Sequence, residues 1–87
     1  MKELTLFYLP DCPHCKLALR YLEELKREDP RFDKIPVRMI NERVEKELAN
    51  SYNYWYVPCF FLDGQNLHEG HAERTDVQQV LEQALQA

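Results

Sequence analysis

The sequence predicts an α/β protein in which a four-stranded mixed sheet is flanked by helices, in the order β-α-β-α-β-β-α. Segments rich in β-branched, aromatic and aliphatic residues alternate with segments whose apolar residues recur at helical spacing. An early strand–helix–strand unit implies a parallel, right-handed crossover. A strong turn dipeptide, Asp63-Gly64, separates two later strand segments and adds an antiparallel hairpin.

The size and composition of the chain fit this class. Its 87 residues are 45% hydrophobic and 30% charged, which allows one domain with a small core. We expect that domain to span residues 1–87 and to be a monomer. No apolar run approaches the ~20 residues of a membrane-spanning helix, and the net charge of −4 argues against nucleic-acid binding. The two glycines exclude Gly-rich phosphate loops.

The first part of the chain is predicted to form a strand, a helix and a second strand. Residues 3–9 are a mostly buried strand. Residues 13–28 carry a helical stripe of apolar side chains. Pro13 lies in the first turn of this helix, where its missing N–H costs nothing, and Pro30 ends it. Residues 35–40 form the second strand.

The middle of the chain is predicted to form a helix and an aromatic loop. Asn41 is the expected N-cap of a helix that runs to residue 51, with Val44 and Leu48 on one face. Residues 52–57 contain three tyrosines and the tryptophan. These aromatic side chains either form a wall of a substrate groove or close the core.

The last part of the chain is predicted to form the hairpin and a final helix. Residues 59–62 are a short strand, and residues 65–69 return as an edge strand. Thr75 and Gln78 have the spacing of a capping box. The apolar residues of the helix that follows are Val77, Val80, Leu81, Ala84 and Leu85.

A Cys-x-x-Cys motif follows the first strand directly and opens the first helix. The reactive form of cysteine is the thiolate, and the unpaired amides and dipole of a helix N-terminus favour an anion. We therefore assign Cys12 as the nucleophile that attacks a disulfide and Cys15, one turn further, as the resolving thiol. A protonated His14 would stabilise the Cys12 thiolate, whereas the carboxylate of Asp11 would oppose it.

A Cys-x-x-Cys pair is also half of a zinc site. Besides Cys12 and Cys15, the other candidate ligands are Cys59, His68 and His71, and none of these forms a second ligand pair by spacing. We expect no metal and no built-in cofactor, and we expect the two histidines to lie on the surface of the hairpin. A metal or iron–sulfur site through the three cysteines is kept as a third hypothesis.

The cysteine count also bears on the compartment. Three cysteines do not make a secreted disulfide framework, and the N-terminal segment lacks the features of a signal peptide. We expect a reducing, cytoplasmic setting. Cys59 is either a small buried core residue or a third thiol near the active pair.

The Cys-Pro-His-Cys motif at residues 12–15, together with Val57-Pro58 before a strand–Asp-Gly–strand hairpin, resembles the thioredoxin superfamily. The short element order is similar to that of glutaredoxins and covers nearly the whole chain. The resemblance implies a thioredoxin-like fold and a thiol–disulfide oxidoreductase. It also implies that Pro58 is cis and opposite Cys12, rather than a trans proline that begins a strand. The Val57 backbone would then pair with an extended substrate, and Pro13 would contact it.

The resemblance implies disulfide-containing proteins or glutathione as partners, with electrons from glutathione or a thioredoxin reductase. The chain departs from thioredoxins at Leu6, where they carry a buried acid, and from glutaredoxins at Gly70, where they carry Gly-Gly. The amides of Thr75 and Asp76 could bind the glutathione carboxylate or simply begin a helix. Glutathione is therefore a candidate co-substrate. The alternative function is a non-catalytic binding module or a redox sensor.

Overall fold

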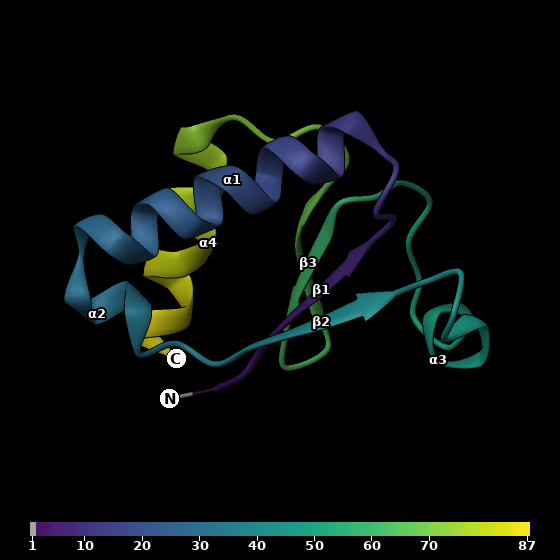
Figure 1. The fold of residues 1–87 in the computed structure, drawn as a ribbon. Coiled ribbons are helices and arrows are strands. Elements are labelled where there is room, and N and C mark those ends of the chain that lie inside the picture. The colour runs from purple at the N-terminus through teal and green to yellow at the C-terminus, as the bar shows by residue number, and fades with distance from the viewer. Residues whose placement is uncertain (1) are drawn as a thin grey trace.

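The computed structural model describes residues 2–87, which form a mixed four-stranded sheet flanked by helices (Figure 1). The predicted α/β fold is confirmed. The strand order is β2-β1-β3-β4, with β1 and β2 parallel and the other two pairs antiparallel. The elements are β1 (Leu4–Tyr8), α1 (Pro13–Glu28), α2 (Pro30–Asp33), β2 (Val37–Asn41), α3 (Lys46–Asn50), β3 (Cys59–Leu62), β4 (Gln65–Glu69) and α4 (Arg74–Gln86).

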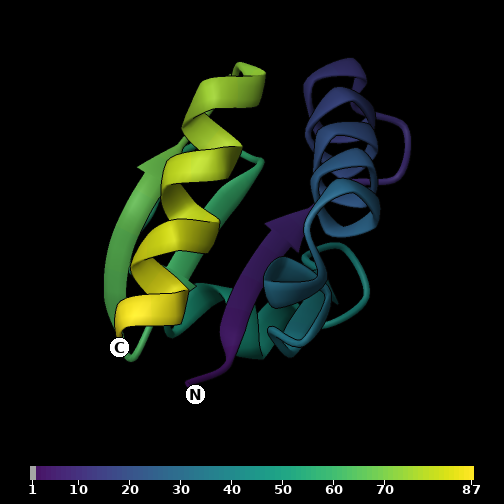
Figure 2. The same cartoon turned by 90° about the vertical axis from the view of Figure 1, so that its left-hand side faces the viewer.

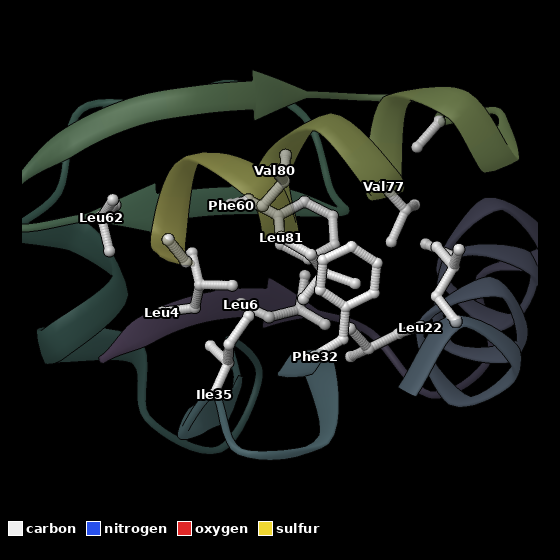
Figure 3. Packing of buried hydrophobic residues seen from close by; sticks show 14 residues of the cluster. Leu4, Leu6, Leu22, Phe32, Ile35, Phe60, Leu62, Val77, Val80 and Leu81 are labelled. Carbon is white, nitrogen blue, oxygen red and sulfur yellow. The ribbon is translucent and has the colours of Figure 1, made fainter. Parts of the chain in front are cut away.

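The sheet separates two hydrophobic cores. Helices α1 and α4 lie side by side on one face, and α3 lies on the other (Figures 1 and 2). Successive side chains of a strand point to opposite faces, so each central strand contributes to both cores. Leu6 and Phe60 pack with the two long helices (Figure 3). Phe7, Cys59 and Phe61 pack on the side of α3.

Helix α1 has the predicted bounds, and Pro13 occupies its first turn. Its core-facing stripe includes Ala18 and Leu22, both buried. The short helix α2 was not predicted, because Pro30 was interpreted only as a terminator. The side chain of Asp29 accepts a hydrogen bond from the Arg31 amide (2.9 Å), and the proline at the first position allows a new helix to begin there.

The helix predicted from Asn41 is largely wrong. Asn41 ends β2, and its carboxamide oxygen accepts a hydrogen bond from the Arg43 amide (3.0 Å). This side-chain contact stabilises a turn in place of the first helical turn. Helix α3 begins only at Lys46, so Val44, which was expected to share a helix face with Leu48, lies before the helix and is 76% exposed.

The predicted start of the last helix is also wrong. Helix α4 begins after Glu73, and its capping box joins Glu73 to Asp76 rather than Thr75 to Gln78. The Glu73 amide donates to Oδ2 of Asp76 (2.9 Å), and the Glu73 side chain accepts from the Asp76 amide. The error arose because a carboxylate fills the role that the sequence motif gives to a hydroxyl.

The hairpin prediction is confirmed. Asp63 and Gly64 join β3 to β4 with φ angles of 52° and 81°. Both values lie in the left-handed region that two-residue hairpin turns require, which glycine adopts without steric cost. Strand β4 is an edge strand, as expected. Within residues 2–87, no helix is both long enough and apolar enough to cross a bilayer.

Candidate active site

Cys12 lies at the N-terminus of α1, immediately after the loop that leaves β1. Its backbone is extended (φ −88°, ψ 122°), and its carbonyl accepts the first helical hydrogen bond from the Lys16 amide (3.0 Å). The Cys12 side chain does not cap the helix, so its sulfur is not tied to the first-turn amides. Cys12 is half-buried, whereas Cys15 is fully buried.

The surroundings of Cys15 keep its thiol protonated. Its Sγ accepts a hydrogen bond from the Leu9 amide (3.4 Å) and lies near the thiol of Cys12. Burial raises the pKa of the Cys15 thiol to about 12, and the neighbouring Cys12 and Glu42 act in the same direction. The two thiols are thus close together, and only Cys12 is accessible.

The Val57–Pro58 peptide bond is cis, as the family resemblance implied. Pro58 is buried, and its carbonyl accepts a hydrogen bond from the Gly70 amide (2.8 Å). Val57 is half-buried and packs against the core on the α3 side. The pairing of its backbone with a substrate stays a prediction.

His14 forms a contact that the sequence did not reveal. Its Nδ1 lies 2.9 Å from Nδ1 of His71, and the two rings meet edge to face at 5.0 Å. Nε2 of His71 lies 3.2 Å from Oε1 of Glu73. His71 is therefore part of the site rather than only a surface residue of the hairpin. No local motif indicates this, because the two histidines are 57 residues apart.

Asp11 precedes Cys12 and was expected to oppose ionisation of its thiol. Its carboxylate forms an exposed ion pair with Arg43 (3.2 Å). Such a pair adds little to stability, but the guanidinium offsets the negative charge beside Cys12. Arg43 was not among the predicted site residues, since it follows β2 and has no sequence link to the motif.

The aromatic loop has two kinds of side chain, and only some of them close the core. Tyr52 and Tyr54 pack on Phe7, each with ring centroids 4.8 Å away, and help to close the second core. Trp55 and Tyr56 instead point outward and are 85% and 70% exposed. The loop therefore offers two unburied aromatic rings next to the cis-proline.

The backbone of this loop is held by the carboxylate of Glu69, in β4. Its Oε2 accepts hydrogen bonds from the amides of Trp55 (2.7 Å) and Tyr56 (3.0 Å). The bond from the Trp55 amide is the main cause of a lowered pKa of Glu69. The exposed rings are thus carried on a backbone whose position is fixed by the edge strand.

A groove of about 480 Å³ lies between this loop and α3. Its lining includes Leu9, from the loop before the cysteines, the basic side chains of Arg43 and Lys46, and Trp55. Tyr54 also lines it and donates a hydrogen bond to Glu42 (2.6 Å). The groove therefore has both charged and aromatic walls.

The proposed carboxylate site at the start of α4 is partly occupied. Thr75 is exposed and Asp76 is half-buried. The amide of Asp76 donates to the side chain of Glu73 in the capping box. An external carboxylate would therefore have to displace a carboxylate of the chain itself. Among residues 2–87, no group of three or more His, Cys, Asp and Glu side chains is placed to hold a metal ion.

Cys59 is buried in the second core, on the face of the sheet that α3 covers, and packs with Phe7 and Phe61. This placement fits a core residue, whereas Cys12 and Cys15 lie at the start of α1. Burial raises the pKa of Cys59 to about 12.

These raised pKa values predict a loss of stability in alkali. An unfolded thiol ionises near about pH 8.5, whereas Cys15 and Cys59 keep their protons to about pH 12 in the folded chain. The contribution of these two thiols to the free energy of unfolding is complete below the pKa of the unfolded thiol. It is lost as the pH rises above that pKa, because only the unfolded state releases protons there. The free energy of unfolding, measured with urea, should fall less between about pH 8 and about pH 10 in Cys59→Ala than in the wild type. An equal fall in both proteins would contradict the raised pKa of Cys59.

The geometry defines the class of the protein. A half-buried thiol at a helix N-terminus, a buried thiol one turn later and a cis-proline before a central strand are typical of a thioredoxin-fold dithiol protein. The sequence profile of the Glutaredoxin family matches residues 4–67. The chain belongs to this family, within the thioredoxin superfamily, and is a thiol–disulfide oxidoreductase.

Curated relatives agree with this assignment. The chain is 34% identical over 62 residues to a protein named probable thioredoxin from Methanothermobacter marburgensis, and 36% identical over 62 residues to a thioredoxin from Methanocaldococcus jannaschii. Each match covers 71% of this chain and 71% of the relative.

Solved structures show the same fold. A malarial protein aligns with a TM-score of 0.72 at 14% identity, covering 95% of this chain and 96% of that one. The germline-specific thioredoxin Deadhead from Drosophila melanogaster aligns with a TM-score of 0.69 at 20% identity, covering 93% and 78%.

Proposed function

We propose that this oxidoreductase reduces disulfides in protein substrates through the Cys12–Cys15 pair, in a reducing cytoplasmic compartment. The observation that carries the proposal is the asymmetry of the two thiols. One is half-buried at the helix N-terminus, and the other is buried and close to it. Attack requires an accessible sulfur, and resolution requires a second sulfur within reach of the first.

The reaction follows from these positions. Cys12 releases its proton to solvent, its thiolate attacks one sulfur of the substrate disulfide, the S–S bond breaks, and the first substrate sulfur leaves as a thiolate that takes up a proton from solvent. Cys15 then gives up its proton and attacks Sγ of Cys12, which releases the second substrate thiol. The substrate gains two electrons and two protons, and the protein ends with a Cys12–Cys15 disulfide. An external thiol donor restores the dithiol.

The substrate platform is proposed to combine Pro13, Val57 and Pro58. An extended substrate segment would pair with the Val57 backbone, as in strand addition. The exposed rings of Trp55 and Tyr56 lie in the same loop and would cover side chains that flank the disulfide.

Trp55→Ala tests this platform. Loss of an exposed aromatic contact should raise KM for a protein disulfide about five- to thirtyfold. Because Trp55 is 85% exposed, the free energy of unfolding should change by less than about 0.5 kcal/mol. Val44→Ala removes another exposed apolar side chain outside the loop and serves as the control. Equal KM values for both variants would exclude Trp55 from the platform.

The electron donor is proposed to be a protein reductase or another dithiol rather than glutathione. The site that Thr75 and Asp76 would offer to the glutathione carboxylate already holds the Glu73 side chain, and a second carboxylate there would be repelled. Reduction of the oxidised protein by glutathione and by a thioredoxin reductase should be compared directly. Faster reduction by glutathione than by the reductase would show that glutathione is the better electron donor.

The whole proposal is tested by turnover in an insulin reduction assay with dithiothreitol as the donor. Catalysis above the rate of dithiothreitol alone supports the oxidoreductase. The alternative, a binding module or redox sensor, would bind a partner without turnover.

A further inference from the structure

We infer that His71 is a positioning residue for the dithiol: Glu73, His71 and His14 form one hydrogen-bonded chain that fixes the tautomer of His14 and holds positive charge beside Cys12. The inference rests on the proposed function of Cys12 as the nucleophile. Its basis is a chain of contacts between two helix N-termini that are remote in sequence.

Two contacts make up this chain. Nδ1 of His14 lies 2.9 Å from Nδ1 of His71, and Nε2 of His71 lies 3.2 Å from the carboxylate of Glu73. The first turns of α1 and α4 lie at the same end of the molecule, which brings the two histidines together (Figure 2). Both rings are exposed, so the chain is accessible to solvent and to substrate.

The segment that carries His71 is anchored independently of His14. The Gly70 amide donates to the carbonyl of Pro58 (2.8 Å), and Nε2 of His68 bonds to the His71 carbonyl (2.8 Å). Gly70 has φ 86°, a conformation that glycine tolerates. The backbone that carries His71 is therefore tied to the cis-proline, while its imidazole contacts His14 in the first turn of α1.

The bonding pattern determines the protons. A carboxylate only accepts hydrogen bonds, so Nε2 of His71 must donate to Glu73. A neutral His71 then has an unprotonated Nδ1, which can only accept. His14 must consequently donate from its own Nδ1, and its Nε2 is left free. The chain thus predicts the Nδ1–H tautomer for neutral His14.

The same arrangement can hold one proton more. When the pair takes up that proton, the two rings share it and the carboxylate of Glu73 stabilises the resulting cation. His14 lies between Cys12 and Cys15 in the motif, so this charge stabilises the Cys12 thiolate and the reduced state of the protein. The other titratable or charged groups of residues 10–16 and 68–76 and of the neighbouring loop are Asp11, Cys15, Lys16, Tyr56, His68, Glu69, Arg74 and Asp76.

The chain offers matched variants for a test. In His71→Asn, the side-chain oxygen occupies roughly the place of Nδ1 and can still accept from His14. In His71→Gln, the side-chain nitrogen occupies roughly the place of Nε2 and can still donate to Glu73. His71→Ala removes both contacts. None of the three variants can carry the shared proton.

Two readouts separate the effects. In ¹⁵N NMR spectra at a pH where His14 is neutral, the wild type and His71→Asn should show the Nδ1–H tautomer, and the Gln and Ala variants should show more of the Nε2–H form. In glutathione redox buffers, all three variants should shift the equilibrium about three- to tenfold toward the disulfide, because none of them can carry the shared proton near the thiolate. Far-UV circular dichroism should show that each variant is folded.

An Nε2–H tautomer of His14 in the wild type would overturn the inference. An equilibrium constant of His71→Ala equal to that of the wild type would also overturn it. Cys12→Ser separates this failure from that of the proposed function: if Cys12→Ser retains turnover, the nucleophile is wrong. If Cys12→Ser is inactive while His71→Ala is indistinguishable from the wild type in both readouts, only the role of His71 is wrong.

Discussion

Replacement of Cys12 by serine is expected to abolish disulfide reduction, with turnover falling by about three orders of magnitude or more. Cys12 is the accessible one of the three cysteines, since Cys15 and Cys59 are both fully buried. A serine hydroxyl cannot form the covalent intermediate. The measurement is insulin reduction at fixed dithiothreitol concentration, with the uncatalysed rate subtracted.

The third cysteine provides the matched control. Cys59→Ala also removes one thiol, but from the second core, and should leave turnover unchanged because Cys59 lies on the face of the sheet away from α1. A large loss of turnover in Cys59→Ala, with the fold intact, would show that the third thiol takes part in exchange.

Cys15→Ser should separate the two steps of the reaction. Attack by Cys12 remains, but resolution does not, so the variant should accumulate mixed disulfides that a reductant releases. Mass spectrometry of the trapped species should place the bond on Cys12. A mixed disulfide on Cys15 in a Cys12→Ser variant, formed at the rate of the wild type, would reverse the assignment.

The features that the sequence predicted correctly depend on neighbouring residues. Pro13 at the first helical position and the Asp63-Gly64 turn act over a few residues, so a local reading finds them. The same holds for the contiguous Cys-Pro-His-Cys motif, which places Cys12 at the helix start and Cys15 one turn further.

The features that the sequence did not reveal depend on side chains that meet only in the fold. His14 and His71 are 57 residues apart, and Asp11 and Arg43 are 32 apart. Neither pair has a spacing rule, because the sheet and the helix packing bring the residues together. Asn41 misled the prediction for another reason: its side chain satisfies the backbone of a turn as readily as that of a helix.

Phe60→Ala should cause the largest loss of stability of any single truncation considered for this chain. Phe60 lies in a central strand, is fully buried, and packs in the core that the sheet shares with α1 and α4 (Figure 3). Truncation of a buried phenylalanine costs about 3–5 kcal/mol, because apolar contacts are lost and a cavity remains. Domains of this kind have about 5–15 kcal/mol in total, so the variant should be close to unfolding at 25 °C.

The control is Phe60→Leu, which keeps most of the volume and should cost less than about 1.5 kcal/mol. Urea unfolding followed by circular dichroism measures both changes. If Phe60→Ala loses no more than Phe60→Leu, the core does not depend on this ring. Alkylation of the two cysteines gives a second measurement, because Cys15 is protected only while α1 stays packed on the sheet. In Phe60→Ala, the alkylation rate of Cys15 should rise with the unfolded fraction. The alkylation rate of Cys12, which is already accessible, should change far less.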